Sequence, residues 1–86
     1  MEKVTVLGVL LSNRTVTSPC FQEIISKHGC NIKTRIGLHT VTDNKCSTDG
    51  VILLEVIGND DEIESLRKDI EAIPDAEVQK MAFTIK

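Results

Sequence analysis

Two short segments of the sequence are apolar at both alternating positions, and they restrict the fold more than any other feature. Residues 4–11 read Val-Thr-Val-Leu-Gly-Val-Leu-Leu, and residues 51–57 read Val-Ile-Leu-Leu-Glu-Val-Ile. Runs of this kind predict strands that carry apolar side chains on both faces of a sheet. A length of 86 residues predicts a single domain, residues 1–86, with one core.

A helix is expected after the polar turn at residues 12–15. Ser18 has the character of an N-cap and Pro19 suits the first helical position, so the helix is predicted to begin there. Gly29 is predicted to end it in the left-handed conformation. Apolar spacing of i, i+3, i+4 and i+7 predicts one buried stripe, which consists of Phe21, Ile24, Ile25 and His28.

The middle of the chain has the pattern of a hairpin. Residues 31–39 alternate between apolar and polar side chains, which is the period of a half-buried edge strand. The polar residues 40–50 predict the loop that returns the chain antiparallel to the apolar strand at residues 51–57. Gly37 is interpreted as a bulge or as a close approach between chains at an oligomer interface.

A second helix is predicted from Asn59, because Glu62 three residues later completes a capping box. Glu64 and Lys68 offer an exposed i, i+4 ion pair on this helix. Pro74 is predicted to stop it, and residues 76–85 then form a closing strand. The buried stripe of the helix is predicted to be Ile63, Leu66, Ile70 and Ile73.

The element order strand, helix, strand, strand, helix, strand gives two right-handed crossovers, which place both helices on one face of the sheet. This predicts an α+β, ferredoxin-like βαββαβ sandwich, with a four-stranded antiparallel sheet and two helices on one face. The strand at residues 51–57 has apolar side chains at both its odd and its even positions. Whichever of these face the helices, the others leave an apolar surface on the opposite face of the sheet. We therefore expect a homo-oligomer, a dimer or tetramer, most simply a twofold dimer.

Charge and composition argue against several partners. The chain has 10 Lys and Arg against 13 Asp and Glu, and only two aromatic residues, so direct nucleic-acid binding is not expected. No apolar run reaches the length of a membrane span, and the N-terminus lacks the order of a signal peptide, which predicts a cytoplasmic protein with no membrane partner. Cys20, Cys30 and Cys46 are expected to be reduced thiols.

Residues 18–32 resemble the amphipathic helix, terminating glycine and following strand of small-molecule-sensing ACT domains. Residues 32–38, 50–56 and 74–78, with Arg35-Ile36-Gly37 as the most specific piece, resemble the ACT-like family of iron-only hydrogenase system regulators. The resemblance covers nearly the whole chain. It implies a dimeric or tetrameric regulatory module without catalysis, a small-molecule effector, a partner protein and a link to hydrogenase maturation. The turn after the first strand lacks the Asp and Gly that amino-acid-binding ACT domains place there.

The candidate ligand-binding residues lie in two places. Arg35 and Lys33 stand on the polar side of the second strand, where Glu55 is expected opposite one of them. That cross-strand ion pair is the alternative to recognition of an effector carboxylate. The other candidates surround the N-terminus of the first helix, where free backbone N–H groups favour an anion, although an ordinary capped turn is the alternative. These are Ser12, Asn13, Arg14, Thr15 and Ser18.

No catalytic residue, metal ligand or cofactor is predicted. The acidic residues 60–62 are explained by helix N-terminal charge, and His28 by packing and by charge at a helix C-terminus. Two alternatives to a regulatory module stay open. One is a small ferredoxin-like enzyme; the other is a metal sensor that uses His39 and Cys46, which flank the polar loop.

Overall fold

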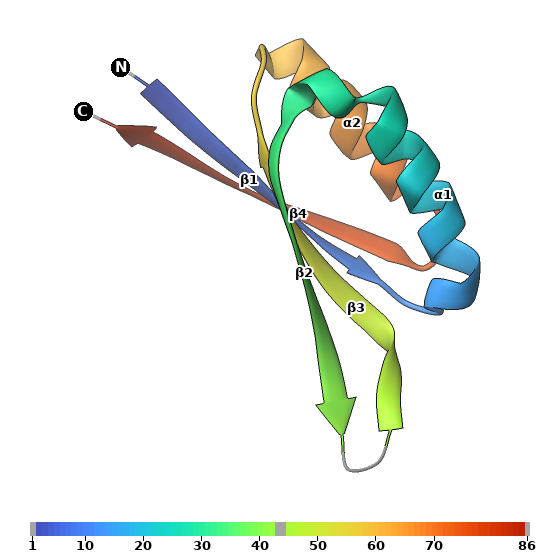
Figure 1. Cartoon of the computed structure of the whole chain (residues 1–86). Helices are drawn as coiled ribbons and strands as arrows, with labels where there is room; N and C mark the ends of the chain where they lie inside the picture. Colours follow the sequence, from blue (N-terminus) through green and yellow to red (C-terminus); the bar gives the residue numbers. More distant parts are fainter. Residues whose placement is uncertain (1, 43–44, 86) are drawn as a thin grey trace.

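The computed structural model describes residues 2–42 and 45–85; within them, the side chains at 2, 14, 15, 39–42 and 45–48 are not described. The elements follow the predicted order (Figure 1). They are β1 (Glu2–Leu11), α1 (Arg14–Lys27), a 3-10 turn (Gly29–Asn31), β2 (Ile32–Thr42), β3 (Lys45–Val56), α2 (Asp60–Glu71) and β4 (Ala76–Ile85).

The strands form one antiparallel sheet in the order β2-β3-β1-β4, and both helices cover the same face of it (Figure 1). The ferredoxin-like α+β fold is therefore confirmed. β1 and β3 are the two central strands, as their apolar composition predicted. Neither described helix has the length and apolar character that crossing a bilayer requires.

The first helix begins earlier than the sequence predicted. It starts at Arg14, and Pro19 lies inside it instead of at its first position. The reason is Thr17, whose buried hydroxyl donates to the carbonyls of Ser12 and Asn13, both at 3.2 Å. The Val16 N–H also donates to the Asn13 carbonyl, so the first turn is already wound before the proline.

The predictions for Gly29 and for the hairpin loop were also wrong. α1 ends at Lys27, and Gly29 begins a 3-10 turn in place of a left-handed cap. The two strands of the hairpin extend much further than predicted, with Thr42 paired to Lys45. Backbone pairing favours this, since the segment contains β-branched Thr and Val residues that suit strands as well as loops. Residues 43 and 44 of the predicted loop lie outside the described residues.

The second helix begins as predicted. The backbone N–H of Asn59 donates to Glu62 Oε1 at 3.0 Å, and the N–H of Glu62 donates to Asn59 Oδ1 at 2.8 Å, which completes the capping box. The hydrogen bond from the Asn59 N–H holds the pKa of Glu62 below its usual value. The predicted stripe Ile63, Leu66, Ile70 and Ile73 is buried.

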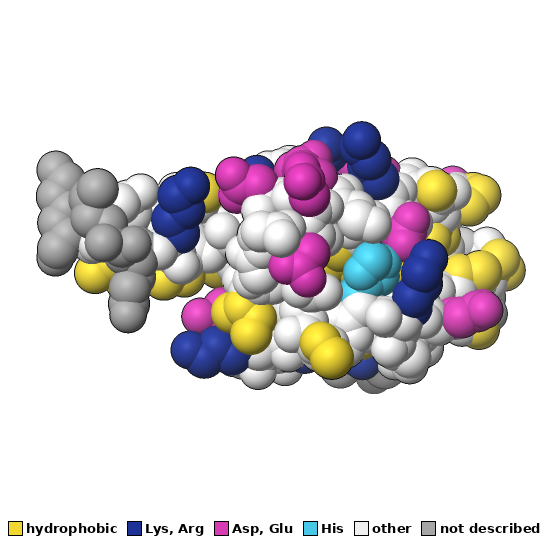
Figure 2. Space-filling view, turned by 90° about the horizontal axis from the view of Figure 1, so that it is seen from above, with side chains coloured by type: hydrophobic (Ala, Val, Ile, Leu, Met, Phe, Trp, Pro, Cys, Tyr) yellow, Lys and Arg dark blue, Asp and Glu magenta, His cyan; other side chains and the backbone are white. Residues whose placement is uncertain are grey.

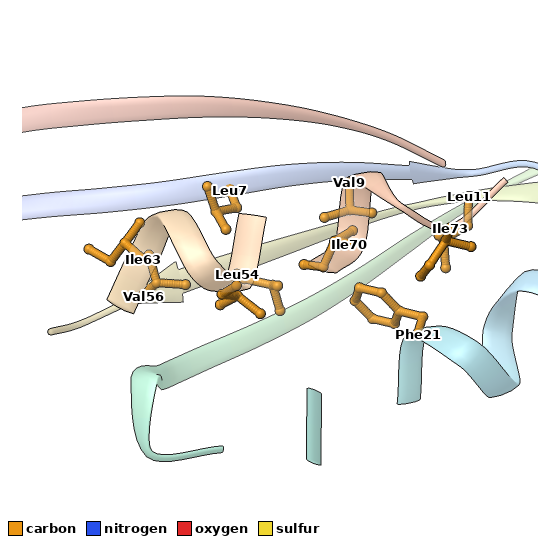
Figure 3. Close-up of a cluster of buried hydrophobic side chains, with 10 residues drawn as sticks. Leu7, Val9, Leu11, Phe21, Leu54, Val56, Ile63, Ile70 and Ile73 are labelled. Atoms are coloured by element: carbon orange, nitrogen blue, oxygen red, sulfur yellow. The ribbon is translucent and has the colours of Figure 1, made fainter. Parts of the chain in front are cut away.

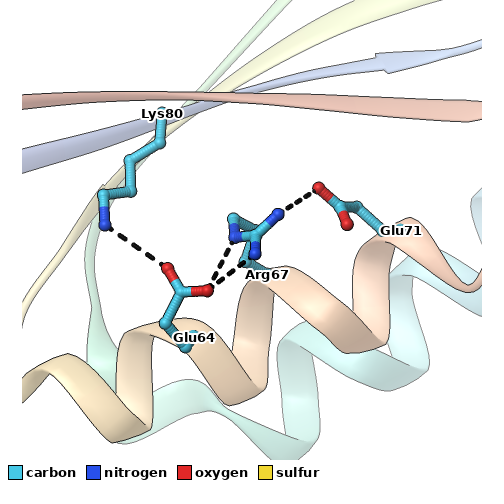
Figure 4. Close-up of polar contacts among 4 residues, drawn as sticks. All are labelled: Glu64, Arg67, Glu71 and Lys80. Carbon is cyan, nitrogen blue, oxygen red and sulfur yellow. Dashed lines mark hydrogen bonds and ion pairs between the residues drawn. The ribbon is translucent and has the colours of Figure 1, made fainter.

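Glu64 does not use Lys68 as its partner. Its carboxylate accepts from Arg67 Nη2 at 2.7 Å and from Lys80 Nζ at 3.3 Å, while Arg67 also binds Glu71 (Figure 4). Hydrogen bonding to Arg67 lowers the pKa of Glu64. Lys80 belongs to β4, so this network ties α2 to the edge of the sheet. On the face of the molecule seen from above, the acidic and basic side chains of the described residues lie close together, and no basic stripe is present there (Figure 2).

The hydrophobic core lies between the helices and the sheet (Figure 3). Phe21 is its one aromatic residue and is fully buried. At roughly 25 cal/mol per Å² of apolar surface, this layer is the main source of stability in the chain. Its members are Leu7, Val9, Leu11, Phe21, Leu54, Val56, Ile63, Leu66, Ile70 and Ile73.

A β-bulge at Lys33 sets which side chains of β2 face the helices. Ile32 pairs with Val56 but Thr34 pairs with Glu55, so β2 advances two residues while β3 advances one. Beyond the bulge, Arg35 pairs with the buried Leu54 and shares its face. The apolar residues that follow on β2 point to the opposite face. The bulge is therefore at Lys33 and not at Gly37, which pairs regularly with Ile52.

The sheet face opposite the helices, here called the open face, is covered by no described part of the chain. It presents large apolar side chains from three strands, each between 36% and 54% exposed. A continuous apolar surface of this kind is unusual on a monomeric protein. These side chains are Ile36, Leu38, Val51, Met81, Phe83 and Ile85.

Candidate functional site

A cleft of about 300 Å³ lies between α1 and the β2–β3 hairpin, on the helix side of the sheet. Arg35 is its cationic residue, and we call it the Arg35 cleft. Gly37 and Gly50 form the floor of the cleft, where the backbone of the sheet is uncovered because neither residue has a side chain that could fill the space. The cleft is lined by Ser18, Gln22, Arg35, Gly37, Leu38, Gly50, Val51 and Ile52.

Arg35 is held in the cleft by two residues of α1. Its guanidinium carbon lies 5.7 Å from the centre of the Phe21 ring, within the range of a cation–π contact. Its Nη1 donates to Gln22 Oε1 at 2.9 Å. Gln22 is neutral, so this contact orients the guanidinium but leaves its positive charge uncompensated. Among the residues whose side chains are described, no carboxylate forms an ion pair with Arg35.

The cross-strand partner of Glu55 is Lys33 and not Arg35. Lys33 Nζ lies 3.8 Å from Glu55 Oε2, and the Thr34 hydroxyl donates to Glu55 Oε1 at 3.4 Å. This exposed ion pair contributes at most about 1 kcal/mol. The bulge separates the two cations: Lys33 remains beside Glu55, whereas Arg35 turns to the helix side, where its donors are available to a ligand.

The structure brings together only part of the group predicted at the N-terminus of the first helix. Ser18 lies in the second turn of α1 and lines the Arg35 cleft, so it stands with Arg35. Ser12 and Asn13 lie at the other side of the first turn, where their carbonyls accept from Thr17. Asn13 caps the helix in the left-handed conformation, with φ of 55°. The side chains of Arg14 and Thr15 lie outside the described residues.

Sequence reasoning did not assign Gln22, Gly37 and Gly50 to a site. Gln22 lies outside the predicted apolar stripe of the first helix and is exposed, but its side-chain oxygen accepts from Arg35 of β2. Gly37 pairs with Ile52, and His39 pairs with Gly50, so the two glycines lie diagonally across from each other on one face. Hairpin register could have revealed that juxtaposition, because it depends only on the alignment of the two strands.

The metal-sensor alternative depends on His39 and Cys46. The side chains of His39 and Cys46 lie outside the described residues. Across the part of the chain that the structure describes, no three His, Cys, Asp or Glu side chains gather closely enough to hold a metal ion. Cys20 and Cys30 are free and exposed.

A second polar cluster joins the two helices. His28 Nε2 lies 2.8 Å from Asp69 Oδ2, and Lys27 Nζ lies 3.5 Å from the same oxygen. The His28 side chain is largely buried, so this contact locks the end of α1 to α2. The hydrogen bond from His28 is the main cause that lowers the pKa of Asp69 from its usual 3.8.

Acid is therefore expected to weaken the packing of the two helices. Because the pKa of Asp69 is lower in the folded chain, its contribution is present above about pH 4 and is lost as pH falls through the folded value. As the pH falls below about 4, the melting temperature of Asp69→Asn should fall less steeply than that of the wild type. Asp75→Asn, an exposed carboxyl in the turn before β4, is the control. Parallel curves for wild type and Asp69→Asn would contradict this prediction.

No family model matches the chain, and no curated protein matches it in sequence. Among solved structures, the uncharacterized protein TM1266 from Thermotoga maritima has a TM-score of 0.80 at 18% identity, over 96% of this chain and 100% of that one. CPII from Thiomonas intermedia, a nitrogen regulatory PII-like protein bound to ADP, AMP and bicarbonate, has a TM-score of 0.60 at 11% identity, over 98% of this chain and 93% of that one. SnoaB from Streptomyces nogalater, a cofactor-independent oxygenase, has a TM-score of 0.57 at 9% identity, over 100% of this chain and 95% of that one. At these identities, the likeness shows that the chain has the ferredoxin-like fold shared by these proteins.

Proposed function

We propose that this chain is a non-catalytic, cytoplasmic regulatory module that senses a small anionic metabolite in the Arg35 cleft. The observation that carries the proposal is a guanidinium oriented by Gln22 and Phe21 with no carboxylate partner among the described residues. Arginine presents a planar fork of donors, which matches the two oxygens of a carboxylate or phosphate. The ligand class is therefore a small carboxylate or phosphate compound.

The shape of the cleft supports a small ligand. A volume of about 300 Å³ is at the lower end of the range for ligand pockets. The floor at Gly37 lets a ligand approach the backbone of β2 closely. Ser18 stands at the other wall, on α1, where its hydroxyl can donate to a second polar group of the ligand.

The regulatory role is proposed from the fold together with the cleft. The sequence resembles ACT-like regulators of iron-only hydrogenase systems, and one structure with the same fold is a nitrogen regulatory PII-like protein bound to nucleotides. We propose that the module acts as a homo-oligomer, a dimer or tetramer, on a partner protein of such a system. The effector would shift the population of one assembly state over another.

A small ferredoxin-like enzyme is the second candidate, favoured by the likeness to the oxygenase SnoaB. His28 and Asp69, which form a histidine–carboxylate pair, lie between the two helices, and no His, Asp or Glu is among the described residues that line the Arg35 cleft. The described polar side chains that line the cleft are those of Arg35, Gln22 and Ser18. These residues bind and orient an anion better than they transfer a proton.

A ligand panel tests the proposal. The full chain is melted with mono- and dicarboxylates, amino acids, nucleotides, inorganic phosphate and divalent metals. A ligand at about 100 times its Kd stabilises the folded state by about 2.7 kcal/mol, which should raise the melting temperature by about 10 °C or more. A shift with one divalent metal alone would favour the metal-sensor alternative instead.

Two variants and a matched control assign the binding to the Arg35 cleft. Arg35→Gln removes the charge, and Gly37→Val fills the floor, where a Cβ has no atom within 4 Å and so disturbs nothing. Both should abolish the shift produced by the anion. Lys33→Gln, which removes a neighbouring cation outside the cleft, should retain it. An anion-induced shift that survives in Arg35→Gln would overturn the assignment.

A further inference from the structure

The open face has a depression of about 340 Å³ at its centre. Gly8 lies on the central strand β1 and, having no side chain, leaves a gap between its neighbours on β3 and β4. Half-exposed apolar side chains surround this gap. The depression is lined by Gly8, Val9, Leu10, Val51, Glu77, Gln79 and Met81.

The fold of one chain does not require glycine at this position. A Cβ added to Gly8 would lie 3.8 Å from Leu53 Cδ2 and 3.9 Å from the Gln79 carbonyl oxygen, which are ordinary contacts. Its φ is not positive, in contrast to that of Gly58. Glycine inside a strand costs roughly 0.5–1 kcal/mol relative to alanine, so it is unfavourable here unless another group occupies the space.

We propose that a second copy of this chain covers the open face and inserts an apolar side chain into the depression at Gly8. Strands of ten residues, at about 3.3 Å per residue and about 4.8 Å between strands, give the face an area of roughly 600 Å² in projection. A stable interface buries about 800 Å² per partner, measured on the rougher accessible surface. The face is thus of the size that one sheet-on-sheet contact requires.

A second copy suits this face better than a different occupant. Each copy presents the same apolar surface, so a twofold axis buries both faces with one contact. A small ligand in the depression would leave Ile36 and Phe83 in water, because neither lines it. Among the charged groups on this side of the sheet, Glu55 lies beside Lys33, and Glu77, which lines the depression, is exposed at the start of β4.

Sedimentation velocity of the full chain from about 1 to 100 µM tests this interface. Wild type should be a dimer or a dimer of dimers. Gly8→Val fills the depression, and Met81→Glu places a charge beside it, so each should raise the dissociation constant at least about tenfold. Val16→Glu is the matched control, because Val16 is 63% exposed on α1 and lies off this face. It should assemble like wild type, and circular dichroism should show that all four proteins are folded.

The inference rests on the homo-oligomer of the proposed function, and the outcomes separate the two. A wild-type monomer at 100 µM would overturn both. A wild-type oligomer that Gly8→Val and Met81→Glu leave intact, or tighten, would overturn the open-face interface and keep the oligomer. The anion-induced shift, measured on the same variants, reports on the Arg35 cleft separately, because the cleft lies on the other face of the sheet.

Discussion

Replacing Phe21 by alanine is expected to lower the free energy of unfolding by about 3–5 kcal/mol, the usual cost of truncating a buried aromatic residue. Phe21 is fully buried between α1 and the sheet and touches the centre of the core (Figure 3). A domain of this size has a small free energy of unfolding, so such a loss should bring the chain close to unfolding at room temperature. Urea denaturation of the purified chain measures the change.

The other phenylalanine provides the control. Phe83 is 54% exposed on the open face, so Phe83→Ala should leave the stability of the single chain nearly unchanged. If the open face is an interface, any loss in Phe83→Ala should grow as the protein concentration increases, whereas the loss in Phe21→Ala should not. Phe21→Leu keeps most of the volume and should cost less than about 1.5 kcal/mol. A loss below about 1 kcal/mol in Phe21→Ala would show that the helix layer is loosely packed.

Replacing Gly58 by alanine is expected to cost about 2–4 kcal/mol, the sum of backbone strain and lost hydrogen bonds. Gly58 has φ of 124°, which side chains rarely allow, and an added Cβ would lie 2.6 Å from Asn31 Nδ2. Asn31 joins this connection to the start of β2, donating to the Ile57 carbonyl at 3.0 Å and to Glu62 Oε2 at 3.3 Å. The alanine would therefore displace the amide that links β3 to α2.

Gly29→Ala is the matched control for Gly58→Ala. Gly29 has no positive φ, and an added Cβ would meet nothing within 4 Å. This substitution should be neutral or should stabilise the chain by up to about 1 kcal/mol, because it restricts the unfolded state. Thermal unfolding of the two variants beside wild type measures the contrast. Equal losses in the two variants would contradict the conformation assigned to Gly58.

Local patterns were sufficient to predict the fold. Some features depend only on residues that are close together in the sequence, so they can be read from it directly. They are the strands with apolar side chains on both faces, the capping box at Asn59 and the end of the second helix before Pro74. The start of α1 could not be predicted in this way. It depends on the burial of Thr17, which only the packed structure determines, and this outweighed the local preference of Ser18 and Pro19 for a helix start.

The candidate site was predictable only in part, for a similar reason. Arg35 and Ser18 were singled out by residue type and neighbourhood, and both line one cleft. Their meeting depends on a bulge at Lys33 that no local signal announces, because a lysine in an alternating strand looks like any solvent-facing residue. The length of the hairpin was likewise set by cross-strand pairing and not by the polarity of residues 40–50.

The extra residue at Lys33 has a consequence for how the two faces could diverge between related chains. A related chain that kept this residue but paired regularly from Ile32 onward would turn Ile36 and Leu38 toward α1 and Arg35 toward the opposite surface. The cleft would lose its cation, and the exposed apolar layer would shrink and gain a charge, in one step. The loss of this one bulge, with no substitution at any contact, would therefore change both surfaces together.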